Sequence, residues 1–229
     1  MQPVRQASGL IGQDFSLALL AAAAGTLDVL GFLRLGPALM SAMTGNGALL
    51  GLAIGQHRFA AALHSLAAFG GFVGGVAGGA VLLDEAADGW SARVTAVVSI
   101  EAVLLGAFAL LWLTSGDPRS EAAVYALILL ASGGMGLQSA AVRQLRIPGV
   151  TTTFFTGTLT SIVTSAVRAG GRRPATNMTP QLVALVAYVG AAAVAGLAAA
   201  HGADAIALLP VAAVVVTLAA RAVAGAPGQ

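Results

Sequence analysis

The chain has 229 residues, of which 58% are hydrophobic and only 9% are charged. A soluble domain carries about a quarter charged residues, so this composition excludes a soluble globular protein, a disordered chain and a nucleic-acid-binding protein. All 11 basic residues are arginines, and the absence of cysteine excludes disulfides and thiolate chemistry. We therefore expect a polytopic protein whose main partner is the lipid bilayer and which binds no nucleic acid.

Eight apolar runs follow one another along the chain, separated by short breaks that carry the charges and the turn formers. A membrane-spanning helix needs about 20 apolar residues, and these Ala- and Leu-rich runs lack the alternation of a lipid-facing barrel. They predict an all-α transmembrane bundle of six to eight membrane segments, forming a single membrane domain over residues 1–229. The N-terminus lacks the features of a removable signal peptide, so we expect the first run to remain as an anchor. The runs are Phe15–Leu35, Ser41–Gly55, Phe59–Leu83, Val94–Leu113, Ala122–Ala141, Thr152–Val167, Leu182–Ala200 and Ala205–Ala220.

Two of these runs, Ser41–Gly55 and Thr152–Val167, are short and rich in Thr, Ser, Gly or Asn, and each follows a proline-containing break. Short, interrupted segments at matching places in two halves of a membrane protein indicate broken helices that line a binding site. The alternative is a pair of short, tilted or interfacial helices whose hydroxyl groups bond their own backbone.

An internal repeat relates the two halves of the chain. Gly25-Thr-Leu-Asp28 precedes Thr44-Gly45-Asn46, and Gly136-Leu-Gln138 precedes Thr156-Gly157-Thr158 at nearly the same spacing. We expect a duplication with repeats at about 15–113 and 122–220. If both short runs cross the membrane, the halves are parallel; if both enter and return, the halves are inverted. The arginine distribution places the N- and C-termini in the cytoplasm in either case.

Few ionisable residues lie inside the apolar runs. Asp28 is a functional candidate, because a carboxylate at the membrane centre costs about 2.5–3.5 kcal/mol on insertion scales. The alternative is an ion pair with Arg34 or Arg143. Glu101 competes for the same role, with pairing to Arg93 or a shallow position as its structural alternative, and His64 is expected to be a hydrogen-bonded helix residue.

The two Thr-Gly segments offer hydroxyl groups, an amide and backbone exposed by glycine. If each begins a half-helix, its free N–H groups and positive dipole end favour an anionic or carboxylate-bearing solute. Gln138 takes about the place of Asp28 in the second half, and Arg143 balances the charge of Asp28. The candidate solute-binding residues are Asp28, Thr44, Gly45, Asn46, Gln138, Arg143, Thr156, Gly157 and Thr158.

The third run contains two interleaved glycine ladders that make one helix face nearly smooth. Such faces allow another helix to approach closely, either within the chain or in a homodimer through Gly70, Gly74 and Gly78. Histidines at metal-ligand spacing, a nucleophile elbow and a phosphate-binding loop in its proper context are all absent from the sequence. We therefore expect neither a metal nor a cofactor.

Several of these motifs together resemble the YoaK-like family of bacterial integral membrane proteins, a domain of unknown function. The similarity extends from about Phe15 to Ala220, and departs from the family pattern at Ser139-Ala140. It implies a multi-pass protein of the bacterial inner membrane that moves a small solute. The motifs are Gly25-x-x-Asp28, Gly31-Phe32, Met43-Thr44-Gly45-Asn46, Gly134-Met135-Gly136-Leu137-Gln138, Ala141-x-Arg143 and Thr152-Thr153-x-x-Thr156-Gly157-Thr158-Leu159-Thr160.

The leading hypothesis is a secondary transporter or permease of a small solute, with its site between the two Thr-Gly segments and Asp28 as the ion- or proton-coupling group. A second hypothesis is an intramembrane enzyme that uses Asp28 and Glu101 as an acid/base pair. A third is a non-catalytic membrane subunit that docks through its glycine ladders.

Overall fold

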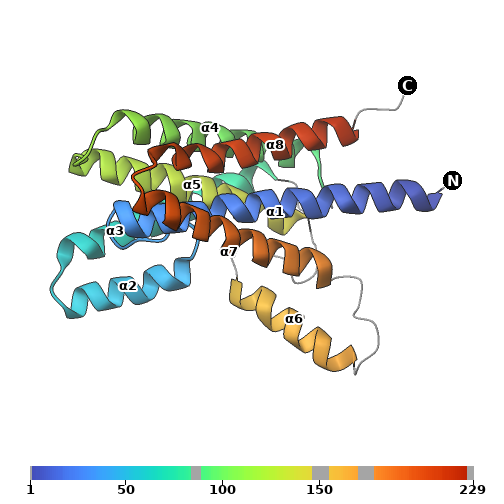
Figure 1. Cartoon of the computed structure of the whole chain (residues 1–229), viewed down its shortest axis with the longest axis horizontal. Coiled ribbons are helices and arrows are strands. Elements are labelled where there is room, and N and C mark those ends of the chain that lie inside the picture. The colour runs from blue at the N-terminus through green and yellow to red at the C-terminus, as the bar shows by residue number, and fades with distance from the viewer. Residues whose placement is uncertain (1, 84–88, 146–154, 170–177, 226–229) are drawn as a thin grey trace.

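The computed structural model describes residues 2–83, 89–145, 155–169 and 178–225, and these residues form an elongated bundle of helices without strands (Figure 1). The N-terminal end of the first helix and the C-terminal end of the last lie at the same end of the bundle. The elements are α1 (Gln2–Arg34), α2 (Met43–Gly55), α3 (Phe59–Leu82), α4 (Ala92–Thr114), α5 (Glu121–Gln144), α6 (Phe155–Ala169), α7 (Met178–Ala200), the 3-10 turn η1 (Asp204–Ala207) and α8 (Leu208–Gly225).

Within the described ranges, six helical stretches are long and apolar enough to cross a membrane: α1 from Asp14 onward, α3, α4, α5, α7 from Pro180, and η1 with α8. The helices α2 and α6 have 13 and 15 residues. At 1.5 Å per residue neither reaches across a hydrocarbon core of about 30 Å. The predicted all-α membrane bundle with short second helices is confirmed.

The helix boundaries differ from the apolar runs mainly in the first half. α1 begins at Gln2, well before the run at Phe15, and α2 begins at Met43, two residues after the run at Ser41. Gly36, with a φ of 79°, and Pro37 follow the last turn of α1. A positive φ and a proline both end an α-helix, so residues 35–42 are not helical. The first three residues of the run Thr152–Val167 lie outside the described residues.

The first helices of the two halves, α1 and α5, run in opposite directions (Figure 1). Arg34 at the end of α1 pairs with Asp117, just before α5 begins. Leu20, nearly four turns further back in α1, accepts a hydrogen bond from Gln138, near the end of α5. In the described residues, α1 and α5 are therefore antiparallel, which is the relation expected of first helices in inverted halves.

The first helix of each half packs against helices of the other half. α1 packs on α7 and α8, whereas α5 packs on α3 and α4; in the same way, α2 packs on α3 and α6 packs on α7. Buried positions correspond at one constant spacing along the chain, for helix pairs α3/α7 and α4/α8 alike. These pairs are Ser65 and Gln181, Ala68 and Ala184, Gly79 and Ala195, Val97 and Ala213, Val98 and Val214, and Glu101 and Thr217.

Glycines allow the exchanged helices to touch backbone to backbone. A Cβ on Gly25 of α1 would collide with the backbone carbonyl of Tyr188 in α7, and one on Gly136 of α5 would collide with that of Phe72 in α3. One glycine ladder of α3, which contains Gly75, lies directly on α5. The ladder of Gly70, Gly74 and Gly78 has open space beside it in the described structure.

Candidate functional site

The segment 35–42 folds back along α1 into the interior of the bundle. Ala38 and Met40 lie against Gly31, and Ser41 reaches Asp28. Asp28 lies six residues before Arg34, the last residue of α1, which places it about 9 Å inside that end at 1.5 Å per residue. The chain thus enters the membrane region as an extended segment and returns as helix α2, which makes residues 35–55 a re-entrant hairpin.

Hydrogen bonds of the Asp28 side chain connect this hairpin to helices α1 and α7. Its side chain is 2% exposed, and Oδ1 accepts a 2.6 Å hydrogen bond from the Ser41 backbone N–H. Oδ2 accepts a 2.7 Å bond from the Ser41 hydroxyl and a 2.6 Å bond from the Tyr188 hydroxyl of α7. The alternative of an ion pair with Arg34 or Arg143 is wrong, because the one ion pair among the described residues joins Arg34 to Asp117. Neutral donors hold Asp28 instead.

Asn46 holds the hairpin together from the helical side. Its fully buried amide donates from Nδ2 to the Leu39 carbonyl at 2.5 Å and accepts from the Leu39 N–H at 2.8 Å. The Asn46 side chain therefore satisfies both the N–H and the carbonyl group of Leu39 in the non-helical segment. Thr44 is exposed, and α2 begins without a side-chain cap, so helix geometry leaves the N–H groups of Thr44 and Gly45 without intrahelical acceptors.

The structure keeps the two Thr-Gly segments apart. Helices α2 and α6 make no contact with each other in the described ranges, and Figure 1 shows them well separated along the bundle. Thr156 and Gly157 are exposed, while Thr158 is buried with its hydroxyl unpartnered.

The other two candidates of the second half also lie away from Asp28's contacts. The amide Nε2 of Gln138 donates to the Leu20 carbonyl of α1 at 3.2 Å. Arg143 is exposed in the last turn of α5. Counted from Gly25 and Gly136, it is Ser139, one residue after Gln138, that matches Asp28.

Glu101 and His64 differ from their expected structural roles. Glu101 of α4 is fully buried and neither carboxyl oxygen has a hydrogen-bond partner, so the alternative of pairing with Arg93 is wrong. Helices α1 and α4 make no contact in the described parts of the chain, so Asp28 and Glu101 are not neighbours. The His64 ring packs on Tyr125 with centroids 5.2 Å apart, and its buried Nδ1 has no partner.

An open cavity of about 330 Å³ lies where the re-entrant hairpin meets the start of α3. Its walls are mostly apolar, with one cationic side chain, Arg58, and one imidazole, His64. The lining residues are Gly36, Pro37, Arg58, Phe59, Ala60, Ala61 and His64.

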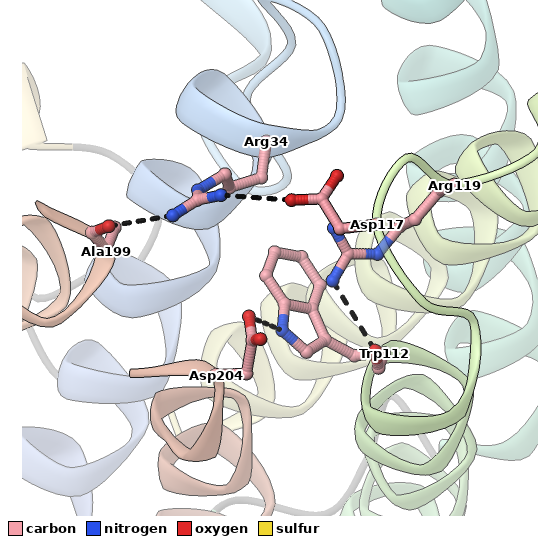
Figure 2. Close-up of polar contacts among 6 residues, drawn as sticks. All are labelled: Arg34, Trp112, Asp117, Arg119, Ala199 and Asp204. Carbon is pink, nitrogen blue, oxygen red and sulfur yellow. Dashed lines mark hydrogen bonds and ion pairs between the residues drawn. The ribbon is translucent and has the colours of Figure 1, made fainter. Parts of the chain in front are cut away.

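A polar cluster ties the helix ends together near the end of α1 (Figure 2). Arg34 donates to the Ala199 carbonyl at the end of α7 at 2.7 Å and lies 3.7 Å from the Asp117 carboxylate. Beside it, the indole of Trp112 donates to Asp204 at 3.2 Å, and Arg119 stacks 4.0 Å above the same ring. We call these residues the end clamp; they join α1, α4, η1 and the end of α7, and so link both halves.

Six apolar spans with a re-entrant hairpin define a polytopic α-helical membrane protein. The family described as "Protein of unknown function (DUF1275)" matches residues 16–220, and the chain belongs to this family. The UPF0700 transmembrane protein YoaK of Bacillus subtilis (strain 168) is 39% identical over 148 residues, which are 64% of this chain and 64% of that relative. The matched part thus spans just under two thirds of YoaK. No solved structure matches the chain.

The sequence indicates Asp28 as a candidate site residue but does not identify its two hydrogen-bond partners, Ser41 and Tyr188. Ser41 was seen only as the start of an apolar run, although its place four residues after Pro37 is a signal for a non-helical entry. Tyr188 is 160 residues away from Asp28 along the chain. The one local signal for Tyr188 is that it is the sole aromatic residue of an Ala- and Val-rich helix.

Proposed function

We propose that the protein is a secondary transporter or permease of a small solute. The observation that carries the proposal is the re-entrant hairpin, whose extended arm brings non-helical backbone into the membrane region beside Asp28. Irregular backbone at membrane depth is tolerated where it is buried in protein or lines a cavity, and broken helices at the interface of inverted halves are typical of secondary transporters.

We also propose that the two halves arose by duplication. Antiparallel first helices, the reciprocal packing of α1 and α5, and buried positions at one constant spacing support this origin. Two inverted halves of similar shape can exchange conformations, so that a site opens first to one side of the membrane and then to the other. The end clamp then closes one side in the described conformation.

The solute is expected to carry an anionic group. The open N–H groups of Thr44 and Gly45 and the hydroxyl of Thr44 form donors at a helix start, where the helix dipole favours negative charge. Arg58, which follows the other end of α2, supplies the positive charge of the cavity at the start of α3. In this proposal Thr44 and Gly45 contact the solute, while Asp28 and Asn46 position the hairpin.

The two alternatives have weaker support. The enzyme hypothesis needs Asp28 and Glu101 in one cavity, whereas their helices do not touch in the described structure. The subunit hypothesis gains the open ladder of Gly70, Gly74 and Gly78 as a contact face. A dimer of transporters would use that face equally well, so the ladder does not distinguish the two roles.

Uptake into proteoliposomes tests the proposal. Vesicles with purified protein are incubated with a defined mixture of small organic and inorganic anions, and their contents are compared with those of protein-free vesicles by mass spectrometry. We expect at least one compound to accumulate, and Thr44→Val to reduce that uptake. The matched control is Thr160→Val, because this exposed hydroxyl bonds its own helix at the Thr156 carbonyl.

Equal contents in vesicles with and without protein, or uptake by Thr44→Val equal to that of the parent, would rule out this transport mode. Asp28→Asn is measured alongside. Since Asp28 holds the hairpin, we expect this variant to lose uptake together with thermal stability, whereas Thr44→Val should lose uptake alone.

A further inference from the structure

Glu101 is a buried acidic residue whose carboxyl group has no hydrogen-bond partner in the described structure. It lies in the middle of α4, its exposed fraction is 0%, and neither Oε1 nor Oε2 has a hydrogen-bond partner. Among the described residues, no arginine or histidine nitrogen lies within 4.0 Å of its carboxyl oxygens. This distinguishes Glu101 from Asp28, both of whose oxygens accept hydrogen bonds.

The neighbouring elements bring no charge to Glu101. α4 packs on α5, α8, η1 and, to a small extent, α3. On α5, Gly134 lies beside Glu101, because a Cβ at this glycine would lie 3.8 Å from Cγ of Glu101. The titratable residues of these elements are engaged elsewhere or lie toward helix ends: Glu121, Tyr125 and Arg143 on α5, Arg221 on α8, Asp204 on η1 and His64 on α3. On α4 itself, Arg93 lies about 12 Å away along the helix.

The corresponding position in the other half shows that packing does not require a carboxyl group here. Thr217 of α8 lies at the matching buried position, and its hydroxyl donates to the Ala213 carbonyl of its own helix at 2.9 Å. Threonine thus fills this place with its polar group satisfied. Glu101 fills it with a larger group whose polar atoms are unsatisfied, which is expected of a residue kept for a role other than packing.

We propose that Glu101 is the proton-binding site of the protein, and that it carries the coupling proton. An ionised carboxylate without a partner is strongly disfavoured in this environment, so in the described conformation the group is the neutral acid. A metal cation would require several oxygen ligands, and among the described residues no group of three or more acidic, histidine or cysteine side chains could hold one. The role as coupling proton rests on the transport function proposed above.

The position of α4 explains how the proton is loaded and released. α4 contacts α8 and α5, which both belong to the other half. Movement of one half against the other separates these helices and admits water to Glu101. The carboxyl group then releases its proton as hydronium to the water on that side, and the carboxylate takes up a proton again before the helices close.

Carbodiimide labelling of the unmodified protein tests this site without a solute. Apolar carbodiimides react with protonated carboxyl groups in membrane proteins, and peptide mass spectrometry identifies the modified residue. With dicyclohexylcarbodiimide on protein in lipid nanodiscs, we expect Glu101 to be labelled in mildly acidic buffer. Labelling should fall about tenfold per pH unit once the group ionises, because it follows the protonated fraction. The exposed Glu121 serves as the internal control.

Labelling of Glu101 that does not change between acidic and alkaline buffer would overturn the proposal, because it would show a permanently protonated structural residue. Absence of labelling at every pH, together with a carboxylate band in infrared difference spectra that Glu101→Gln removes, would overturn it as well. Glu101→Thr, which copies Thr217, provides a second variant that fits the site.

The outcome separates this proposal from the transport function. If Glu101 shows pH-dependent labelling but vesicles accumulate no compound, the proton site stands and the transport proposal falls. If a compound accumulates and an imposed pH gradient stimulates its uptake equally in the parent and in Glu101→Thr, transport stands and Glu101 is not the coupling site.

Discussion

Asp28 connects three stretches of chain that are far apart in sequence: α1, the extended arm at Ser41, and α7 at Tyr188. Each contact is a short hydrogen bond to a buried carboxyl group. Hydrogen bonds to charged groups contribute about 1.5–3 kcal/mol, more than most neutral pairs, because an unpartnered carboxylate in this position is so unfavourable. The hairpin is therefore anchored by this carboxyl group in addition to the burial of its apolar residues Leu35, Ala38 and Met40.

Replacing Tyr188 by Phe should lower the free energy of unfolding by roughly 1–3 kcal/mol, because Oδ2 of Asp28 loses one of its two donors. Thermal unfolding of the purified protein in detergent measures the change. Tyr125→Phe is the matched control, since the Tyr125 hydroxyl makes no hydrogen bond in the described structure and the ring contact with His64 is kept. Equal stability of Tyr188→Phe and Tyr125→Phe would show that the Asp28 contact contributes nothing.

The sequence allowed Asp28 to be predicted as a buried acidic residue, because a lone carboxyl group in an apolar run is visible without any structure. It did not reveal the contacts of Asn46. An asparagine beside Thr44 and Gly45 suggests solute binding, yet its amide bonds the backbone of Leu39, seven residues earlier. The hydrogen-bond partner of the Asn46 amide depends on the path of the non-helical arm, and the local sequence does not determine that path.

Close contacts between glycine-bearing helices determine how α1 seats on α7. A side chain at Gly25 would meet the backbone of Tyr188, which cannot rotate out of the way. Overpacking of this kind costs about 1–3 kcal/mol or more. We expect Gly25→Ala to lower the unfolding temperature clearly.

Gly70→Ala should leave the stability of the monomer unchanged or slightly raised, because the space beside Gly70 is open and alanine favours helix. The two substitutions are compared by thermal unfolding in the same detergent. A similar effect of both would contradict the assigned packing faces of α1 and α3.

The end clamp lies where four chain segments meet, and its ion pair between Arg34 and Asp117 is partly exposed. Such pairs contribute about 0–1 kcal/mol to stability, too little to hold the fold but enough to bias two conformations by up to about fivefold. We expect Asp117→Asn to raise the reactivity of a cysteine placed at Ala42 toward a membrane-impermeant thiol reagent. The chain has no cysteine of its own, so the label reports that position alone.

The same measurement in Glu121→Gln controls for a general change of charge near that end. If Asp117→Asn leaves the labelling rate at position 42 equal to that of the control, the clamp does not gate access to the hairpin. Arg34→Gln should behave like Asp117→Asn, with an additional effect from the lost bond to the Ala199 carbonyl.

The existence and order of the helices were predictable, because hydrocarbon requires long apolar runs and charged breaks. The non-helical conformation of the segment before α2 was harder to predict. Ser41 and Ala42 continue the apolar run in composition, yet they are not helical, and the Ser41 backbone N–H donates to Asp28. A tertiary hydrogen bond thus accompanies the start of α2, and the only local signal for it is Pro37.

The inverted arrangement of the halves makes a clear topological prediction. With six crossings, eight arginines lie on the side of the N-terminus and three, Arg34, Arg58 and Arg119, on the other. Because arginine accumulates on the cytoplasmic side, the termini should be cytoplasmic. Alkaline phosphatase fused after His57 or after Gly116 should then be active, while a fusion at the C-terminus should be inactive. Inactive fusions at both internal positions would instead support eight crossings.

The homodimer through Gly70, Gly74 and Gly78 remains a prediction. These glycines form a smooth, open stripe on α3, and such stripes allow close helix contact in membranes. Gly74→Cys should form a disulfide-linked dimer in native membranes under mild oxidation, whereas Val103→Cys, on an exposed face of α4, should not. Cross-linking at neither position, with a monomer mass in nanodiscs, would contradict the dimer.

The reciprocal exchange of first helices has a consequence for biogenesis. Tyr188 leaves the ribosome 160 residues after Asp28, a delay of roughly 8–30 s at ordinary rates of protein synthesis. During that interval α1 resides in the bilayer without the two helices that cover it. A half-made chain therefore displays an acidic group and bare glycine surface to the lipid, and it depends on insertase or protease surveillance until translation is complete.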